Sequence, residues 1–493
     1  MNRRKCFYPL VIIMMIFTMQ SCKTTSSTAK GSITGLILLD GETDHSGIVV
    51  SIFTAGLVPE KVRQIRQDYP QLAFPINDQV IFDHRDFAPL KTVFTSETGS
   101  FAFEKLPYGE YIIAYSKEGW GYNYLYDLRL DSEKLILGSE PQLSLYEEIM
   151  LPNMIGGNFI LESDKCYVAD SDVVLDQNAS LLFGSNARLL LKPYVKIIAQ
   201  GIIMGPQASQ RAYVTSYSGV HPDVPLQMGL AEGLQLIRSG SQLENLSLSY
   251  LSIGLKVQGS DQVMNRLSFT NCVTGLTINA ATNASLSNSF FANNLNTNSA
   301  ACYSYDVQGL SASYNVFYNN FIAQKHEIVK NALMRNNAYI DNDIGFQNLW
   351  ESTALFEHNY IVSDGSGVEN SGKSNLEILS NELHARIGVK TYTSYDWIDT
   401  PTLGWTKANN NIFDCEEYSV SCKAVYYFGV EPMPLDFKHN YWNSTSIAFI
   451  EASILDYYDL PPYDGPLHGV HYGIIEFLPF RNSLVADAGI QPE

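Results

Sequence analysis

Short apolar stretches alternate with polar turns through most of the chain, and seven of these stretches align on one asparagine. The aligned residues are Asn288, Asn315, Asn337, Asn359, Asn381, Asn411 and Asn440, separated by 27, 22, 22, 22, 30 and 29 residues. Two positions after each asparagine stands a large apolar residue, namely Phe290, Phe317, Tyr339, Ile361, Leu383, Phe413 and Trp442. From Asn315 onward the third position before the asparagine is also apolar, as Ala312, Met334, Phe356, Ile378, Ala408 and Phe437. The repeating unit is therefore a short strand, a polar turn and a second short strand.

A period near 22 residues predicts the rungs of a parallel β-helix, in which each rung stacks on the one before it at about 4.8 Å. Equivalent residues then form columns along the axis, and the apolar columns are expected to face inward. Asparagine suits a turn column because it tolerates a left-handed backbone. Its amide both donates and accepts, so stacked asparagines can bond to one another as a ladder. The earlier stretch "NRLSFTNCVTGLTI" belongs to the series but fits the asparagine column less well.

Residues 31–135 show a different pattern, in which apolar positions alternate between glycine and aspartate turns. "GSITGLILLDGETDHSGIVVSIFTAG" predicts two or three strands, and "TVFTSETGSFAFEKLPYGEYIIAYSKEGW" predicts three more. Between them, residues 59–90 form an insertion with a predicted helix at "PEKVRQIRQDY". Residues 136–152 are expected to link this region to the repeats.

Three parts of residues 31–135 resemble the carboxypeptidase regulatory-like domain, a transthyretin-like β-sandwich. They are the Gly-x-Ile-x-Gly at residues 31–35, the stretch at 95–103 and "LPYGEYII". The resemblance implies a spacer or docking module without catalysis, and the insertion departs from the family pattern.

Both ends of the repeat region resemble right-handed β-helix proteins of the pectin-lyase-like superfamily. "NASLLFGSNARLLLKPYVKI" and "YVTS" stand where the opening rungs of that group have "GATLTIEPGV" and "FTS". "HNYWNSTSIAFIEASILDYYD" and "GIIEFLPF" are similar to its closing segment. The resemblance implies a β-helix over residues 153–445 and a cap and tail over 446–493. Four residues at helical spacing are expected to cover the last rung, Ile447, Ile450, Ile454 and Tyr458.

The chain is therefore predicted to be all-β, with an N-terminal β-sandwich followed by a right-handed parallel β-helix, a solenoid, and a C-terminal capping segment. Because this fold hosts many functions, the fold alone does not identify an activity.

Residues 1–21 have the pattern of an export signal. A basic segment at positions 3–5 precedes the apolar run "PLVIIMMIFTM", which is shorter than the roughly 20 residues that a membrane-spanning helix needs. The small Ser21 before Cys22 resembles a bacterial lipoprotein signal, which is cleaved before the cysteine that carries the lipid. The resemblance implies lipidation at Cys22, a flexible tether over 22–30 and a lipid anchor in the bacterial cell envelope. The expected location is the outer membrane, facing the periplasm or the cell surface.

The charge of the chain restricts its partners. It carries 51 acidic and 32 basic residues, for a net charge of −19. This charge disfavours nucleic acid and anionic membrane surfaces, so the expected membrane contact is through the N-terminal lipid alone. An acidic polysaccharide would also be repelled unless a local basic patch or a bound cation offset the charge.

The cysteines and acids offer few candidate sites. Cys415 and Cys422 flank a short segment and suit a disulfide in an oxidising compartment, with two free buried thiols as the alternative. Asp341 and Asp343 form the best acid pair, since alternate residues of a strand share a face, and are candidates for catalysis or calcium binding. The alternative is that they are solvated turn residues. No cofactor is otherwise predicted, and no CxxC pair or His/Cys cluster indicates a metal site.

Catalytic motifs of this fold are not found in the repeats. The Asn-Thr-Asp, Asp-Asp and Gly-His-Gly motifs of polygalacturonase-like families do not occur. The basic residues that we located in the rungs do not share one column, as a lyase base with its partners would require.

The long interval between Asn381 and Asn411 contains "TYTSYDWIDTPTLGW", which must leave the coil. The residues predicted to bind carbohydrate here are Tyr392, Tyr395, Asp396, Trp397, Asp399 and Trp405. Aromatic rings stack on the apolar faces of sugars, and carboxylates accept hydrogen bonds from sugar hydroxyls. The alternative is that the aromatic residues pack the loop onto the wall of the helix.

Together these features favour a lipid-anchored envelope protein that binds a glycan or another surface component without catalysis. One alternative is a polysaccharide lyase or glycoside hydrolase with a site assembled across rungs, and another is a structural or adhesive surface protein. A groove with three or more carboxylates, or a lysine with carboxylates, would favour the enzyme. A groove of asparagine, serine and aromatic side chains would favour binding.

Overall fold

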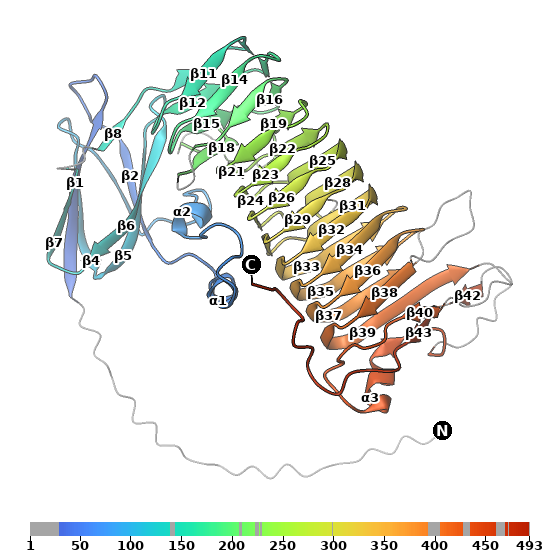
Figure 1. The fold of residues 1–493 in the computed structure, drawn as a ribbon. Helices are drawn as coiled ribbons and strands as arrows, with labels where there is room; N and C mark the ends of the chain where they lie inside the picture. The colour runs from blue at the N-terminus through green and yellow to red at the C-terminus, as the bar shows by residue number, and fades with distance from the viewer. Residues whose placement is uncertain are drawn as a thin grey trace, which may run out of the picture.

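The computed structural model is mostly β, with 54% of residues in strands and 5% in helices. It describes residues 29–138, 143–206, 210–221, 226, 229–297, 299–392, 405–426, 434–459, 469–471 and 473–492. An N-terminal β-sandwich is followed by a long parallel β-helix, and an insertion from the sandwich lies along one side of the helix (Figure 1).

The sandwich consists of two four-stranded sheets, one containing β4, β1, β7 and β8 and the other in the order β3-β2-β5-β6. The strands are β1 (Lys30–Leu39), β2 (Val49–Thr54), β3 (Lys91–Phe94), β4 (Ser100–Pro107), β5 (Gly109–Ser116), β6 (Tyr122–Leu130), β7 (Lys134–Leu137) and β8 (Leu143–Leu145). Alternate apolar residues fill the space between the sheets, as Ile33, Ile52 and Phe103 do. Since β7 and β8 both pair with β1, the sandwich extends to Leu145, and part of the expected linker 136–152 is strand.

The insertion between β2 and β3 contains α1 (Glu60–Asp68), which confirms the predicted helix, and α2 (Asp78–Ile81). Its apolar side chains, including Phe74, form one buried cluster with Phe290 and Val316 of the β-helix. The backbone N–H of Ala73 donates to the carbonyl of Tyr314 at 2.7 Å. The insertion therefore joins the sandwich to the side of the helix.

The β-helix has about 11 turns, each with strands on three faces that we call faces A, B and C in chain order. Face A contains β11 (Asn158–Leu161), β14 (Ser180–Phe183), β17 (Ile202–Met204), β20 (Gln242–Glu244), β23 (Val263–Asn265), β26 (Ser285–Ser287), β29 (Ser311–Ser313), β32 (Ala332–Arg335), β34 (Thr353–Glu357), β36 (Asn375–Leu379) and β38 (Trp405–Asn409). Face B contains β9 (Ile149–Met150), β12 (Cys166–Ala169), β15 (Arg188–Leu191), β18 (Ala212–Ser216), β21 (Leu246–Ser249), β24 (Ser268–Thr270), β27 (Phe290–Ala292) and β30 (Val316–Tyr318).

Face C contains β10 (Met154–Ile155), β13 (Val173–Leu175), β16 (Lys196–Ala199), β19 (Gly233–Leu236), β22 (Ile253–Gln258), β25 (Thr274–Thr282), β28 (Ala300–Gln308) and β31 (Ile322–Lys330). In the later turns single long strands cover faces B and C, namely β33 (Ala338–Leu349), β35 (Tyr360–Ser371), β37 (Glu382–Tyr392) and β39 (Ile412–Tyr426). Every pairing between neighbouring turns on these faces is parallel, as the sequence repeat predicted.

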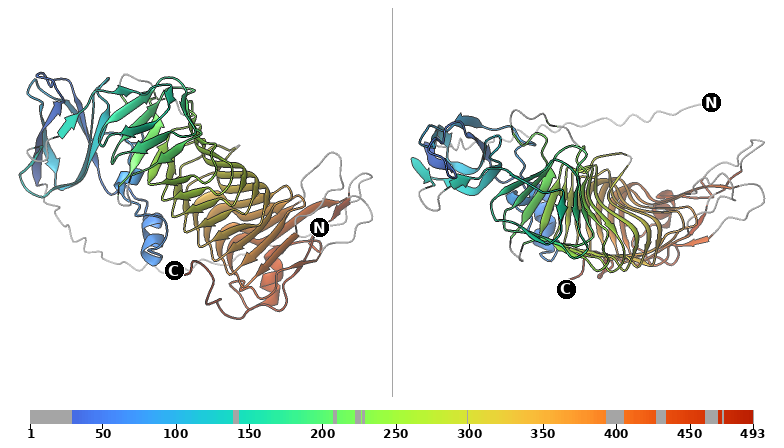
Figure 2. Two further views of the ribbon diagram at one scale, coloured as in Figure 1. Left: turned by 45° about the horizontal axis from the view of Figure 1, so that its top comes forward. Right: turned by 90° about the horizontal axis from the view of Figure 1, so that it is seen from above.

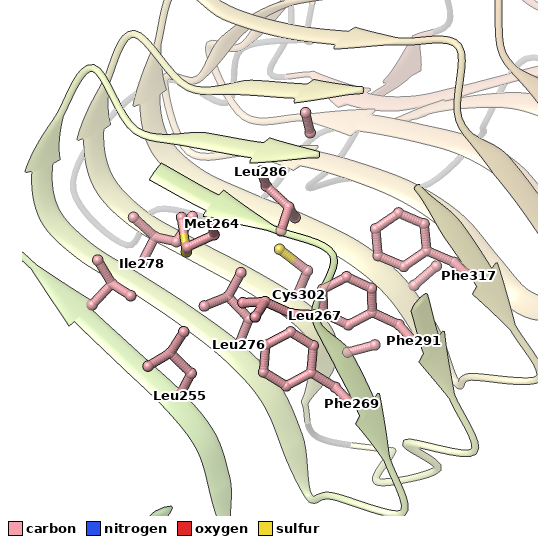
Figure 3. Packing of buried hydrophobic residues seen from close by; sticks show 14 of the residues in the cluster. Leu255, Met264, Leu267, Phe269, Leu276, Ile278, Leu286, Phe291, Cys302 and Phe317 are labelled. Atoms are coloured by element: carbon pink, nitrogen blue, oxygen red, sulfur yellow. The ribbon is translucent and has the colours of Figure 1, made fainter. Parts of the chain in front are cut away.

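The inside of the helix is apolar, and aromatic rings stack along its axis (Figure 3). Phe269, Phe291, Phe317 and Tyr339 lie in one column, with ring centroids 4.7, 4.7 and 5.0 Å apart. The prediction that Phe290 belongs to this column is wrong. Phe290 points outward and packs against the insertion, while its neighbour Phe291 faces inward.

Six of the seven aligned asparagines lie in one buried turn column between faces A and B, Asn315, Asn337, Asn359, Asn381, Asn411 and Asn440. The side-chain oxygen of each, from Asn337 onward, accepts hydrogen bonds from the backbone N–H and the side-chain amide of the one before, at 2.8 to 3.1 Å. Asn288 lies outside this column. Ser289 takes its place and donates its backbone N–H to the Asn315 side chain at 2.9 Å.

The left-handed conformation belongs to the position before the ladder, not to the ladder asparagines. Asn288, Tyr314, Asn336, His358 and Ser380 all have φ between 50 and 55°. A second, shorter ladder between faces B and C consists of Asn294, Asn320 and Asn342, which the sequence alignment did not identify.

The last turn is covered by α3 (Ile447–Ala452), β40 (Pro434–Asp436), β41 (Ile454–Leu455), β42 (Gly469–His471) and β43 (Ile474–Glu476). Ile450 and Ile454 are buried as predicted, whereas Ile447 and Tyr458 are 48% and 74% exposed. The reason is that α3 ends at Ala452, so the helical spacing does not continue to Ile454 and Tyr458.

The C-terminal tail runs back along the side of the helix to the insertion, and the C-terminus lies beside α1 (Figures 1 and 2). The backbone N–H of Gly489 donates to the carbonyl of Ser380 at 2.9 Å. The side chain of Gln71 donates to the carbonyl of Gln491 at 3.1 Å. Within the described residues, no helix is long and apolar enough to cross a membrane.

Cys415 and Cys422 are free thiols, so the predicted disulfide is not formed. Both residues lie in β39 but on different faces of the helix, Cys415 opposite Ala385 on face B and Cys422 opposite Thr391 on face C. Burial raises the pKa of each thiol to about 12.

Candidate functional site

The predicted sugar-binding segment is only partly described. Tyr395, Asp396, Trp397 and Asp399 lie outside the described residues, and Tyr392 and Trp405 stand on either side of them. Trp405 is half-buried and packs against the core of the helix. The Tyr392 hydroxyl donates to Glu369 at 3.2 Å. These two side chains therefore contact the wall of the helix.

Asp341 and Asp343 do not form a pair. Asp341 has a φ of 53° and lies in an irregular part of β33, so the alternation of side chains is broken there. Its carboxylate bonds to Lys61 of the insertion at 2.6 Å, and Asp343 is exposed. Among the described residues, no group of three His, Cys, Asp or Glu side chains is placed to hold a metal ion.

One lysine and one carboxylate meet on face C beside Tyr392. Glu369 is buried and accepts hydrogen bonds from Gln347 at 2.8 Å and Lys390 at 3.1 Å. Burial, together with the Glu369 charge, raises the pKa of Tyr392 above its usual value. A tyrosine that acts as a general base needs a lowered pKa, which is the opposite of the shift at Tyr392. Lys390 is held in its ion pair with Glu369. This cluster therefore does not favour a lyase.

His384 lies between two carboxylates on face B. Its Nε2 atom is 2.8 Å from Glu382 and its Nδ1 atom is 3.3 Å from Asp414. The hydrogen bond to Glu382 raises the pKa of His384 above 6.5, with the charges of both carboxylates adding to the effect. The folded state therefore favours the imidazolium form.

This geometry predicts a pH dependence of stability. The contribution of His384 is fully present below its unfolded pKa and is lost as the pH rises through the higher folded pKa. As the pH rises from about 6.5, the ordinary pKa of histidine, through the higher folded pKa, we expect the unfolding free energy of the wild type to fall more than that of a His384→Gln variant. Urea titrations at several pH values measure this difference, and parallel pH profiles would contradict the assignment.

A cavity of about 470 Å³ lies where the insertion, strand β6 and the β-helix meet. Aromatic side chains form much of its wall, Phe74 from the insertion, Tyr124 and Tyr126 from β6, and Tyr213 from β18. Amide side chains also line it, namely Asn77, Gln79, Asn186, Gln210 and Asn245. Its volume is within the range of small-molecule sites, on the order of 300 to 1,000 Å³.

A buried ion pair fixes the insertion beside the cavity. Arg85 donates to both oxygens of Asp83, at 2.8 and 2.6 Å, and to Thr215 of the helix at 2.7 Å. The guanidinium also lies 3.8 Å from the ring centroid of Tyr250. Burial would raise the pKa of Asp83, but the Arg85 cation lowers it to about 2. The pair is thus charged, and Arg85 ties the insertion to the β-helix through Thr215.

Among the residues that the structure describes, two arginines and no carboxylate line the cavity. The Arg211 guanidinium bonds to neutral acceptors, the carbonyls of Leu246 and Arg266 at 3.1 Å and the hydroxyl of Ser247 at 3.2 Å. It also lies 3.8 Å from the ring centroid of Phe74. Burial lowers the pKa of Arg211 to about 10, and the nearby Arg266 cation adds to this shift.

Arg266 has unused hydrogen-bonding capacity. Its Nε atom is buried and has no hydrogen-bond partner among the described residues. The hydroxyl of Tyr126, across the cavity wall, is also buried and has no partner in the described part of the chain. Buried polar groups are normally bonded, so these two atoms are available to hydrogen-bond a molecule in the cavity.

A third arginine lies behind the aromatic wall. Arg188 is buried beside the rings of Tyr122, Tyr124 and Tyr213, with its guanidinium 4.8 to 5.4 Å from their centroids. It donates to Asn186, and no carboxylate pairs with it among the described residues. Three acids lie near these residues. Asp164 accepts from Asn186 at 2.7 Å, and Asp78 and Asp127 line a small adjoining pocket together with Asn77, Gln79 and Tyr126. Among the described residues, the lining of the cavity itself carries two arginines and no carboxylate, in a chain of net charge −19.

The residues that line the cavity could not be grouped from the sequence, because they come from segments far apart in the chain. One signal was present. In "NRLSFTNCVTGLTI", which fits the repeat less well, Arg266 occupies the left-handed position that is asparagine in the next turn, Asn288. The equivalent position carries asparagine, tyrosine, histidine or serine in the other described turns, so Arg266 is the residue that brings a guanidinium to this column.

No protein-family model and no curated protein matches the chain.

Proposed function

We propose that this protein is a lipid-anchored component of the bacterial cell envelope that binds a glycan without degrading it. The signal-like segment and Cys22 support the anchor. The observation that carries the binding proposal is the cavity between the insertion, β6 and the β-helix, with its aromatic and amide side chains and its unpaired polar atoms. Such a lining suits a sugar, which presents apolar C–H faces to aromatic rings and hydroxyls to amides.

The composition of the cavity favours binding over catalysis. A glycosidase needs two carboxylates on either side of the bond that is cleaved, and none of the described residues lining this cavity is a carboxylate. On face C the buried carboxylate of Glu369 is already bonded to Gln347, Lys390 and Tyr392. The geometry of the cavity thus supports recognition of an intact glycan.

Filling the cavity tests this function. We expect Gln79→Trp, at the cavity wall, to abolish glycan binding by the full-length protein, because an indole ring would occupy the space of the ligand. Gln64→Trp, on the exposed side of α1, is the matched control and should bind as the wild type does. A glycan array followed by titration measures binding, and mass spectrometry of the recovered glycan measures its length. Shortened glycan, or equal binding by both tryptophan variants, would overturn the proposal.

A further inference from the structure

The cavity is positively charged although the protein as a whole is acidic. Arg211 and Arg266 both line it, and each makes the environment of the other more positive. The hydrogen bonds of the Arg211 guanidinium go to carbonyl and hydroxyl oxygens, none of which carries a charge. Two neighbouring cations, with no carboxylate among the described residues that line the cavity, are unfavourable in a partly buried site, and a bound anion would relieve this.

Arg266 is placed at a conformational cost. Its φ is 56°, in the left-handed region that asparagine tolerates better than arginine. Neighbouring turns carry Asn245 and Asn288 at φ of 56° and 50°, so the fold accepts asparagine in this column. The arginine side chain makes no hydrogen bond within the described residues that would explain its presence. All residues of this column share the left-handed φ, so it is the unpaired buried Nε of Arg266 beside a cavity that indicates a binding role.

We propose that the cavity selects a ligand with an anionic oxygen group, the carboxylate or sulfate of an acidic sugar, held by Arg266 and faced by Arg211. This inference rests on the proposed function and adds the charge of the ligand to it. Guanidinium groups bind carboxylate and sulfate oxygens through strong charge-assisted hydrogen bonds. The aromatic wall would contact the sugar ring, and the Tyr126 hydroxyl is free to bond to a ligand oxygen. An acidic glycan repelled by most of the surface would thus find one local site of opposite charge.

The variant Arg266→Asn tests the inference without disturbing the fold. Asparagine relieves the left-handed strain, so the melting temperature should be unchanged or higher, while the charged donor is lost. The matched control is His439→Asn, an exposed residue with a φ of 62° at the equivalent position of the last turn. The full-length protein is titrated with inorganic sulfate, glucuronate, a hyaluronan oligosaccharide and the same oligosaccharide with its carboxylates reduced to alcohols, all at constant ionic strength.

We expect sulfate or glucuronate to bind the wild type and His439→Asn equally, and to bind Arg266→Asn about tenfold more weakly or not at all. Equal binding of these anions by all three proteins, or no anion binding by any of them, would overturn the inference. If sulfate binding depends on Arg266 but no glycan of the array binds, the anion site is supported and the glycan-binding function is refuted. Cavity-dependent binding of neutral and acidic oligosaccharides with equal affinity would keep the glycan function and refute the charge selection.

Discussion

Replacement of Asn359 by alanine is expected to lower the free energy of unfolding by roughly 3 to 5 kcal/mol. Asn359 is completely buried in the ladder between faces A and B. Its side-chain oxygen accepts from the backbone and side chain of Asn337 at 2.9 and 3.1 Å, and its amide donates to Asn381 at 3.0 Å. The same amide also donates to the carbonyls of Met334 and Glu357.

Alanine would leave several of these partners buried and unpaired at once. Each unsatisfied buried group costs about 1 to 3 kcal/mol, and water cannot reach the column to replace the lost bonds. Asn375→Ala is the matched control, since Asn375 lies on face A with an exposed side chain, and it should change stability by no more than about 0.5 kcal/mol. Chemical denaturation measures both, and similar values for the two variants would show that the ladder does not support the fold.

Replacement of Phe317 by alanine is expected to cost about as much, roughly 3 to 5 kcal/mol, for a different reason. The ring of Phe317 is completely buried between those of Phe291 and Tyr339, at centroid distances of 4.7 and 5.0 Å. Figure 3 shows it beside Phe291. The hydrogen bonds between rungs hold the neighbouring turns at a fixed spacing, so the cavity left by alanine cannot collapse.

The same denaturation experiment distinguishes stacking in the core from general loss of apolar surface. Tyr305→Ala removes an aromatic side chain of β28 that is 40% exposed, and it should cost far less. Phe317→Leu keeps an apolar side chain in the core and should lose less stability than Phe317→Ala. A cost for Phe317→Ala no larger than that for Tyr305→Ala would contradict the stacked core.

The β-helix could be predicted from sequence because its determinants repeat. Asn315, Phe317 and their equivalents recur at fixed spacing, and the columns of a solenoid place such residues together. The alignment is wrong by one residue at Asn288. Asn288 occupies the left-handed position that precedes the ladder, and the ladder position itself is Ser289. Because side chains alternate along a strand, that slip of one residue exchanged the outward Phe290 for the inward Phe291.

The candidate site could not be predicted in the same way. Phe74, Tyr126 and Arg266 come from the insertion, the sandwich and the helix, and they meet only because the insertion docks on the helix. No periodic pattern connects residues so far apart in the chain. The aromatic residues that visibly break the repeat lie instead in the interval after Asn381, where Tyr392 and Trp405 contact the wall of the helix.

The most direct test of glycan recognition at the junction is a crystal structure of the full-length protein with the acidic oligosaccharide that binds it most tightly. We predict a sugar chain of unchanged length in the cavity, its ring against Tyr124 or Tyr126 and its anionic group within about 3 Å of the Arg266 guanidinium. A sugar bound instead along face C beside Glu369 and Tyr392, with the cavity empty, would contradict the proposed site.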